Sequence, residues 1–149
     1  MTPYVRFGLM IATSTVVMFG LMYLNTYALD HVAFSETRAY MALLMGAVMA
    51  VIMMGFMWGM HENKKANVGI LAASVAVFAL TLWLVRSQET VQDESWMKAM
   101  IPHHSIAILT SERAELSDPR VRELANGIIK TQREEIAQMK RLIADLEAN

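Results

Sequence analysis

The sequence predicts an all-α protein in which three transmembrane helices are followed by an extracytoplasmic two-helix antiparallel hairpin. Of the 149 residues, 55% are hydrophobic and 18% are charged, whereas soluble domains average about 45–50% apolar and about 25% charged residues. The long apolar runs lie in residues 1–85 and most of the charge follows them. We therefore expect a three-span transmembrane domain at 1–86 and a soluble helical hairpin at 87–149.

Three apolar runs are long enough, or nearly so, to cross a lipid bilayer, which takes about 20 residues. The first, Val5 to Leu24, carries only the charge of Arg6. A cleaved signal peptide is its competing interpretation, but the run exceeds the usual core of about 7–15 residues and no A-x-A site follows it. The second run, Ala39 to Met60, has no charged residue, and the third, Val68 to Val85, ends just before Arg86.

The positive charges between the runs predict the orientation in the membrane. Arg6, Lys64 and Lys65 fall on one side, whereas the loop between the first two runs holds a single Arg38 beside two acidic residues. Because cytoplasmic loops carry the excess of Lys and Arg, we expect a cytoplasmic amino terminus. Everything after residue 86 should then lie outside a bacterial inner membrane, in the periplasm of a Gram-negative cell.

A row of methionines runs along the second span at every fourth position: Met41, Met45, Met49, Met53 and Met57. Four steps overshoot a helical turn by about 40°, so the row winds around the helix. It is either a thioether path for a soft cation or packing between helices and lipid. Packing is the favoured interpretation, because a path needs facing ligands and the spans hold few polar residues.

The soluble part has the pattern of two packed helices. The first should run from about 91–94 to about Leu116, and the second from Pro119 to Leu146, with Asp118 and Pro119 suited to the restart. The apolar row of the second helix comprises Val121, Ala125, Ile128, Gln132, Ile136, Met139, Ile143 and Leu146. Because such a hairpin is marginal alone, we expect a homodimer or higher homo-oligomer that completes a four-helix bundle.

Potential metal ligands concentrate at the start of this hairpin. Met97, Met100, His103 and His104 lie within eight positions of one another, in a chain without cysteine. Thioether and imidazole together suit a soft ion such as Cu(I), or Cu(II) through the imidazoles. On a helix, Met97, Met100 and His104 share a side, whereas His103 lies about 100° around the axis.

Spacing from the turn at residues 117–118 predicts what faces these ligands. His104 lies about 13 residues before the turn and Gln132 about 14 after it, so His104 should lie beside Gln132 or Glu135. Met97 and Met139 match in the same way, each about 20 residues from the turn. Glu135 and Met139 share a side of the second helix with Gln132, so they join the candidate ligands. The simpler interpretation of each residue alone is core packing or a hydrogen bond between His104 and Glu135. The stretch is therefore best read as half of a site, completed by the second helix, by a bend at Pro102 or by a second chain.

Other chemistries find little support in the sequence. No Ser/His/Asp arrangement, paired E-x-x-H motif or glycine-rich phosphate loop is present, so we do not expect an enzyme. The formal net charge of −1 gives no basic surface for nucleic acid.

Several segments together resemble the domain of unknown function 305 family over roughly residues 91–146. They are Met100-Ile101-Pro102-His103-His104, Ala107, Asp118-Pro119, Leu124-Ala125, Ile128-Ile129, Gln132, Glu135-Ile136 and Met139. The resemblance implies a ferritin-like helical bundle, extracytoplasmic in several members and linked to copper binding or tolerance. It further implies His103, His104, Met100 and Met139 as ligands, with Met97 as an additional candidate. Unlike many members, this chain has one hairpin and lacks extra methionines after the double histidine.

The leading hypothesis is a membrane-anchored, copper-binding protein for sequestration or delivery, the latter to a copper-handling partner protein. The alternative is a structural module, a membrane-tethered bundle that mediates oligomerisation without obligatory metal. A redox enzyme or transporter component that uses the methionine row is a third hypothesis. Whether His31 joins the site stays open at this level.

Overall fold

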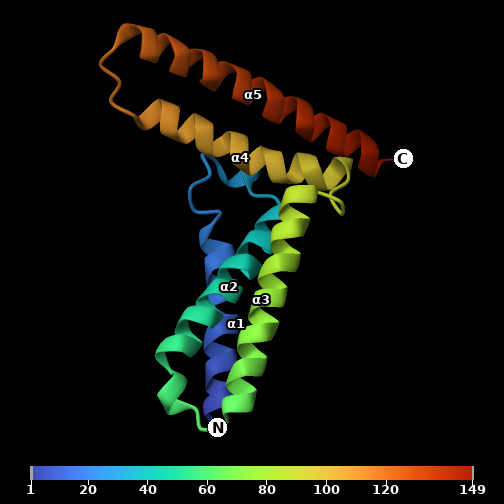
Figure 1. Cartoon of the computed structure of the whole chain (residues 1–149). Coiled ribbons are helices and arrows are strands. Elements are labelled where there is room, and N and C mark those ends of the chain that lie inside the picture. The colour runs from blue at the N-terminus through green and yellow to red at the C-terminus, as the bar shows by residue number, and fades with distance from the viewer. Residues whose placement is uncertain (1, 149) are drawn as a thin grey trace. The chain divides into compact units, whose positions relative to one another are not determined.

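The computed structural model describes residues 2–148, which form five α-helices and two short 3-10 helices without a β-strand (Figure 1). The α-helices are α1 (Pro3–Leu21), α2 (Glu36–Phe56), α3 (Lys64–Ser87), α4 (Asp93–Arg113) and α5 (Pro119–Glu147), and the 3-10 helices are η1 (Leu29–His31) and η2 (Trp58–Met60). The predicted all-α class is confirmed. Helices α1, α2 and α3 are long and apolar enough to cross a membrane.

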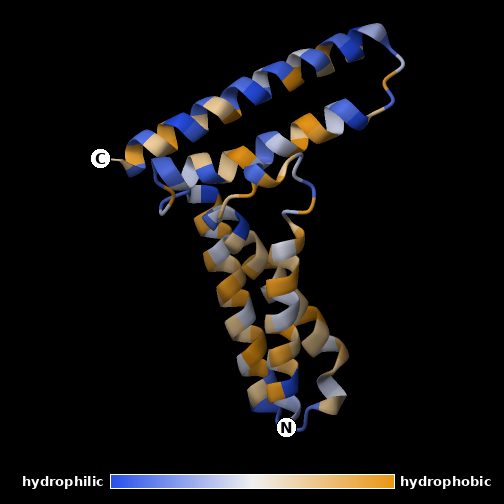
Figure 2. Ribbon diagram, turned by 180° about the vertical axis from the view of Figure 1, so that it is seen from behind, coloured by the Kyte–Doolittle hydropathy of each residue, from blue (hydrophilic) through white to orange (hydrophobic). Residues whose placement is uncertain are grey.

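The chain forms two compact units, and their division differs from the one expected at residue 86. The first unit comprises residues up to 22 and 37–90, and the second comprises 23–36 and 91 onward. The loop between the first two apolar helices thus belongs with the hairpin. Figure 2 shows the contrast in composition: hydrophobic colours dominate α1, α2 and α3, whereas hydrophilic ones are frequent on α4 and α5.

Local capping explains why the helices begin and end a few residues from the apolar runs. Helix α1 begins at Pro3 because the Thr2 hydroxyl accepts a hydrogen bond from the Val5 amide at 3.3 Å. Helix α3 begins at Lys64 because the Asn63 side chain accepts from the Ala66 amide at 3.1 Å. Helix α2 ends at Phe56, and the last residues of its apolar run form η2. Apolar composition marks a span, whereas caps decide where backbone hydrogen bonding starts.

The first unit packs its helices around a small core and one close approach. Phe7, Ala50 and Met54 are buried there, with partly buried methionines around them. A Cβ placed at Gly46 of α2 would lie closer than 3.0 Å to the hydroxyl oxygen of Thr15 on α1, so this glycine permits the two helices to approach. Of the methionine row, Met41 is exposed and the other four are half-buried.

One end of this unit is fastened by hydrogen bonds. The Tyr4 hydroxyl lies 2.8 Å from Oδ1 of Asn67 and accepts from the Asn63 amide at 3.2 Å. The start of α1 and the connection between α2 and α3 therefore lie together.

The second unit is built on the antiparallel pair α4 and α5. Its core comprises Met97, Ile101, Ile108, Ile136, Met139 and Ile143. The middle of the predicted apolar row is confirmed as core, because Ala125, Ile136, Met139 and Ile143 are buried. The ends of the row are not, because Val121 is 45% and Leu146 is 50% exposed.

Candidate metal centre

His104 is held between the two helices of the hairpin by both of its ring nitrogens. Its Nδ1 lies 2.9 Å from the Met100 carbonyl oxygen, one turn earlier on α4. Its Nε2 lies 2.8 Å from Oε2 of Glu135 on α5. The side chain of His104 is 16% exposed and that of Glu135 is 46% exposed. The register predicted Gln132 or Glu135 beside His104, and the structure shows the contact with Glu135.

These two contacts fix where the protons lie. A carbonyl oxygen only accepts, so Nδ1 of His104 carries a hydrogen and donates it. Nε2 and the carboxylate of Glu135 can then bond only if a further proton lies between them. An imidazole oriented by a carbonyl through Nδ1, with Nε2 directed at another group, is the arrangement that metal-binding histidines use. A soft ion could therefore take the place of that proton.

The thioethers predicted as ligands gather in the adjacent core. Met97 and Met139 are 5% and 6% exposed and belong to one cluster, with Met100 packed against it. Met100 precedes His104 by four residues, and Met139 follows Glu135 by four. Because α4 and α5 are antiparallel, both methionines lie about 6 Å along the hairpin from the histidine–glutamate pair, in the same direction. The structure thus brings five of the six predicted residues to one part of the hairpin.

His103 is the sixth and lies apart from them. It is exposed, and its ring lies 6.1 Å from that of His104, between centroids, at an interplanar angle of 64°. Helix α4 runs through Pro102, so the divergence of the two imidazoles that α-helical geometry predicts is retained. Within residues 2–148, no three His, Asp or Glu side chains gather as a metal-holding group. A complete site in the hairpin must therefore use thioethers, or ligands from a second chain.

His31 belongs to the hairpin unit but not to the His104 pair. Its Nδ1 lies 2.9 Å from the Ser105 hydroxyl oxygen, which also accepts the Tyr27 amide hydrogen at 2.6 Å. Ser105 is fully buried and faces a different side of α4 from His104, about 100° around the axis. His31 therefore fastens segment 23–36 to α4, and its ring nitrogen is used for that purpose.

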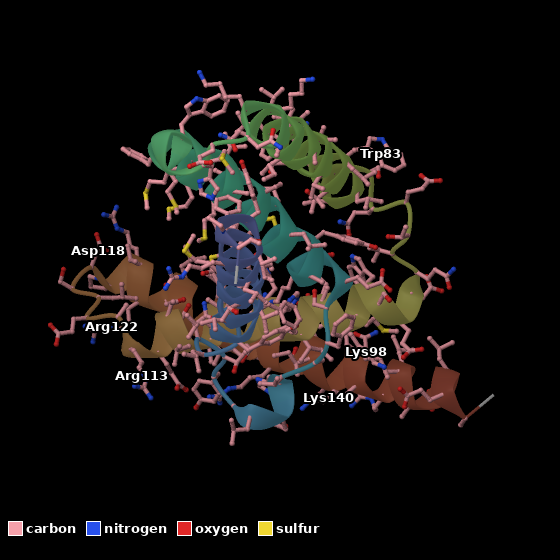
Figure 3. The ribbon with its side chains drawn as sticks, turned by 90° about the horizontal axis from the view of Figure 1, so that it is seen from below. Trp83, Lys98, Arg113, Asp118, Arg122 and Lys140 are labelled. Carbon is pink, nitrogen blue, oxygen red and sulfur yellow. The ribbon has the colours of Figure 1, made fainter. Side chains whose placement is uncertain are left out.

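Charged contacts reinforce the docking of this segment. Lys140, labelled on α5 in Figure 3, donates to Oδ2 of Asp30 at 2.6 Å, and Arg133 lies over the Tyr27 ring, 5.6 Å from its centroid. The bond from Lys140 lowers the pKa of Asp30. Burial, followed by the positive charge of Lys140, lowers the pKa of His31 from its ordinary value, and Asp30 partly opposes this. No pattern in the sequence marked Ser105 as the anchor, because a small polar residue in a helix carries no periodic signal.

Comparison with known proteins adds a family and one relative. Residues 46–143 match a protein family described as a domain of unknown function, DUF305. The chain is also similar to an uncharacterized protein of Acanthamoeba polyphaga mimivirus, with 31% identity over 102 residues, which is 64% of this chain and 67% of the viral protein. No solved structure matches the chain. The matched region begins within α2 and includes α3, α4 and most of α5.

Proposed function

Because the chain belongs to the DUF305 family, we propose that it is a membrane-anchored protein whose hairpin binds copper for sequestration or delivery. The single observation that carries the proposal is the pair of His104 and Glu135. Their facing atoms, Nε2 and Oε2, lie 2.8 Å apart with the imidazole already oriented by the Met100 carbonyl. The resemblance to this family implies a link to copper, and this also supports the proposal.

The donor set favours a soft ion. His104 and Glu135 would hold it, and Met100 and Met139 are the nearest thioethers along the two helices. A zinc site built from nitrogen and oxygen would need three or four such ligands, and thioethers are poor substitutes for them. The ion would supply no turnover in this proposal, since the chain's own residues only bind it.

In this proposal the apolar helices hold the hairpin outside a bacterial inner membrane. Helices α1, α2 and α3 have the length and composition for spanning. Arg6, Lys64 and Lys65 would face the cytoplasm under the positive-inside rule. The hairpin would then meet copper in a compartment where methionine, unlike cysteine, does not form disulfides.

A copper titration of the full-length protein in detergent, with a competing Cu(I) chelator, tests the proposal. We expect Glu135→Gln and His103→Ala/His104→Ala to lose about one equivalent of bound Cu(I), or to bind it at least about 10-fold more weakly. Glu134→Gln is the matched control, since Glu134 is an exposed carboxylate one position earlier on α5. The proposal is lost if Glu135→Gln and the double variant bind copper as tightly as the control.

A specific observation also favours the alternative, a bundle that assembles without metal. Both nitrogens of His104 are hydrogen-bonded within the chain, so the pair also serves as an ordinary buried polar contact. Next to the core, α5 exposes Leu124, Leu142 and Leu146, a surface that a second copy would cover in a four-helix bundle. This alternative predicts that His104→Leu changes the oligomeric state while metal-free protein stays assembled.

The absence of cysteine permits a direct test of the dimer. Leu142→Cys in native membranes should cross-link to a second copy on mild oxidation, because it lies in the surface expected to pair. Arg141→Cys, which is exposed about 100° around the helix, should cross-link far less. Equal cross-linking of the two variants, or none, argues against this interface.

A further inference from the structure

His61 is buried in the first unit with one ring nitrogen unsatisfied. The side chain is 3% exposed, and its Nδ1 lies 3.0 Å from the Met57 carbonyl oxygen. The carbonyl can only accept, so Nδ1 carries a hydrogen, and Nε2 is the ring nitrogen left to bind a metal through its lone pair. That Nε2 is buried and has no hydrogen-bond partner among residues 2–148. A buried acceptor of this kind is rare and needs a partner of some sort.

The groups around His61 supply sulfur. Met10 of α1, Met57 at the end of α2 and Met60 of η2 line one cavity of about 510 Å³ together with His61. Pro3, Arg6 and Phe7 complete its wall. Figure 3 shows sulfur atoms gathered beside α1 and the end of α2. Methionines also pack against the buried Phe7 and Met54 of this unit. Thioether side chains are flexible, so they can converge on an ion smaller than the cavity.

The same local device occurs at both histidines. In Met57-x-x-x-His61 and in Met100-x-x-x-His104, Nδ1 of the ring faces the carbonyl oxygen of the methionine four residues earlier. At His104, Nε2 meets a carboxylate. At His61, Nε2 has no hydrogen-bond partner among residues 2–148, and the residue lines a cavity together with three methionines. A histidine that is oriented through Nδ1, has an unpartnered Nε2 and shares a cavity with soft donors is organised as a ligand.

We propose that Met10, Met57, Met60 and His61 form a second site, for a soft monovalent metal ion, either Cu(I) or its analogue Ag(I). Three thioethers and one imidazole are all neutral, which suits a soft ion of low charge. Arg6 at the wall of the cavity opposes a divalent cation more strongly than a monovalent one. This site lies in the other unit of the chain from His104 and Glu135, and it does not depend on the hairpin binding copper.

Binding of Ag(I) to full-length protein in detergent tests the inference. The starting protein carries His104→Ala and Glu135→Gln, so that the hairpin pair is absent. We expect it to bind about one Ag(I) per chain, and we expect Met57→Leu/Met60→Leu to weaken that binding at least about 10-fold. Leucine for methionine conserves volume, so the fold should survive the change. Met41→Leu/Met45→Leu is the matched control, because these two methionines lie on α2 outside the cavity and should have no effect.

Two further variants separate a cation from other occupants. His61→Phe keeps an aromatic ring between Tyr4 and Phe7 and should weaken Ag(I) binding as the methionine pair does. Arg6→Gln should leave binding unchanged or tighten it, whereas weaker Ag(I) binding in this variant contradicts a cation site and indicates an anion-dependent one. X-ray absorption of the bound silver should show sulfur neighbours.

The outcomes distinguish this site from the one in the hairpin. If the starting protein binds no Ag(I) while the natural chain does, the second site is refuted and the hairpin proposal stands. If the starting protein binds as much as the natural chain, the hairpin proposal fails and the second site stands. If Met57→Leu/Met60→Leu binds like its control, the inference is wrong.

Discussion

Ser105→Ala should release segment 23–36 from the hairpin. The Ser105 hydroxyl is fully buried, accepts the Tyr27 amide hydrogen at 2.6 Å and lies 2.9 Å from Nδ1 of His31. Alanine removes that oxygen and leaves the part-buried Tyr27 amide and His31 ring nitrogen without this partner. Each unsatisfied group of this kind costs about 1–3 kcal/mol. When the segment opens to water, both groups regain hydrogen-bond partners. The loss of docking free energy is therefore limited to about 1–3 kcal/mol.

Hydrogen exchange reports this opening directly. The amides of His31 and Val32 donate within η1, at 3.1 Å to the Ala28 and Leu29 carbonyl oxygens, and they exchange when the segment undocks. A loss of about 1–3 kcal/mol corresponds to exchange that is about 5–150-fold faster. We expect this acceleration in η1, with little change in the amides of α5.

Thr110→Ala is the matched control for this experiment. It also removes one hydroxyl from α4, but Thr110 is exposed and, within residues 2–148, its hydroxyl bonds only to carbonyls of its own helix, at 3.0 Å to Ile106 and 3.2 Å to Ala107. Exchange in η1 should therefore stay within about 2-fold of the natural chain. The reasoning is refuted if η1 amides in Ser105→Ala exchange as slowly as in Thr110→Ala.

Three further predictions concern packing and pH. Gly46→Ala should destabilise the apolar unit by about 1–3 kcal/mol, because the new methyl group meets a hydroxyl on α1; Gly8→Ala, with no atom near its Cβ, should be neutral or slightly stabilising in thermal unfolding. Ile108→Ala, at a fully buried core position, should cost about 2–5 kcal/mol in denaturant unfolding of the hairpin unit. The pKa of His31 is lowered in the folded chain by burial and then by Lys140, so the fold favours the neutral ring. Docking of segment 23–36 should then be fully present above pH about 6.5 and weaken as pH falls from there through the folded-state pKa. The measurement is hydrogen exchange of the η1 amides, corrected for the intrinsic rate at each pH. His31→Gln should remove this pH dependence.

Much of the fold follows from periodic patterns in the sequence. Apolar runs of bilayer length predicted α1, α2 and α3, and three- and four-residue spacing predicted α4 and α5 with the break at Asp118 and Pro119. Counting residues from that break narrowed the neighbour of His104 to Gln132 or Glu135 and placed Met97 near Met139, and the structure shows the contact with Glu135. This succeeded because a short turn and a fixed rise of about 1.5 Å per residue leave an antiparallel hairpin little freedom in register.

The candidate site was predicted less completely than the fold. Composition identified thioether and imidazole near the start of α4, but it could not say which ring nitrogens are already bonded. The tertiary structure decided that both nitrogens of His104 have partners and that His103 faces solvent. Those facts depend on side-chain direction and on the facing helix, which spacing along a single helix does not specify.

The contacts of segment 23–36 and the surroundings of His61 came only from the tertiary structure. Ser105 and His31 are separated by 74 positions in the chain, and Met10 and His61 lie on elements that no local pattern connects. The sequence by itself determined which segments are helices, which are apolar and how the hairpin aligns, because these depend on periodicity and nearby residues. Only the folded chain decided which polar atoms meet and which stay unpaired, because buried hydrogen bonds and cavities form between residues distant in sequence.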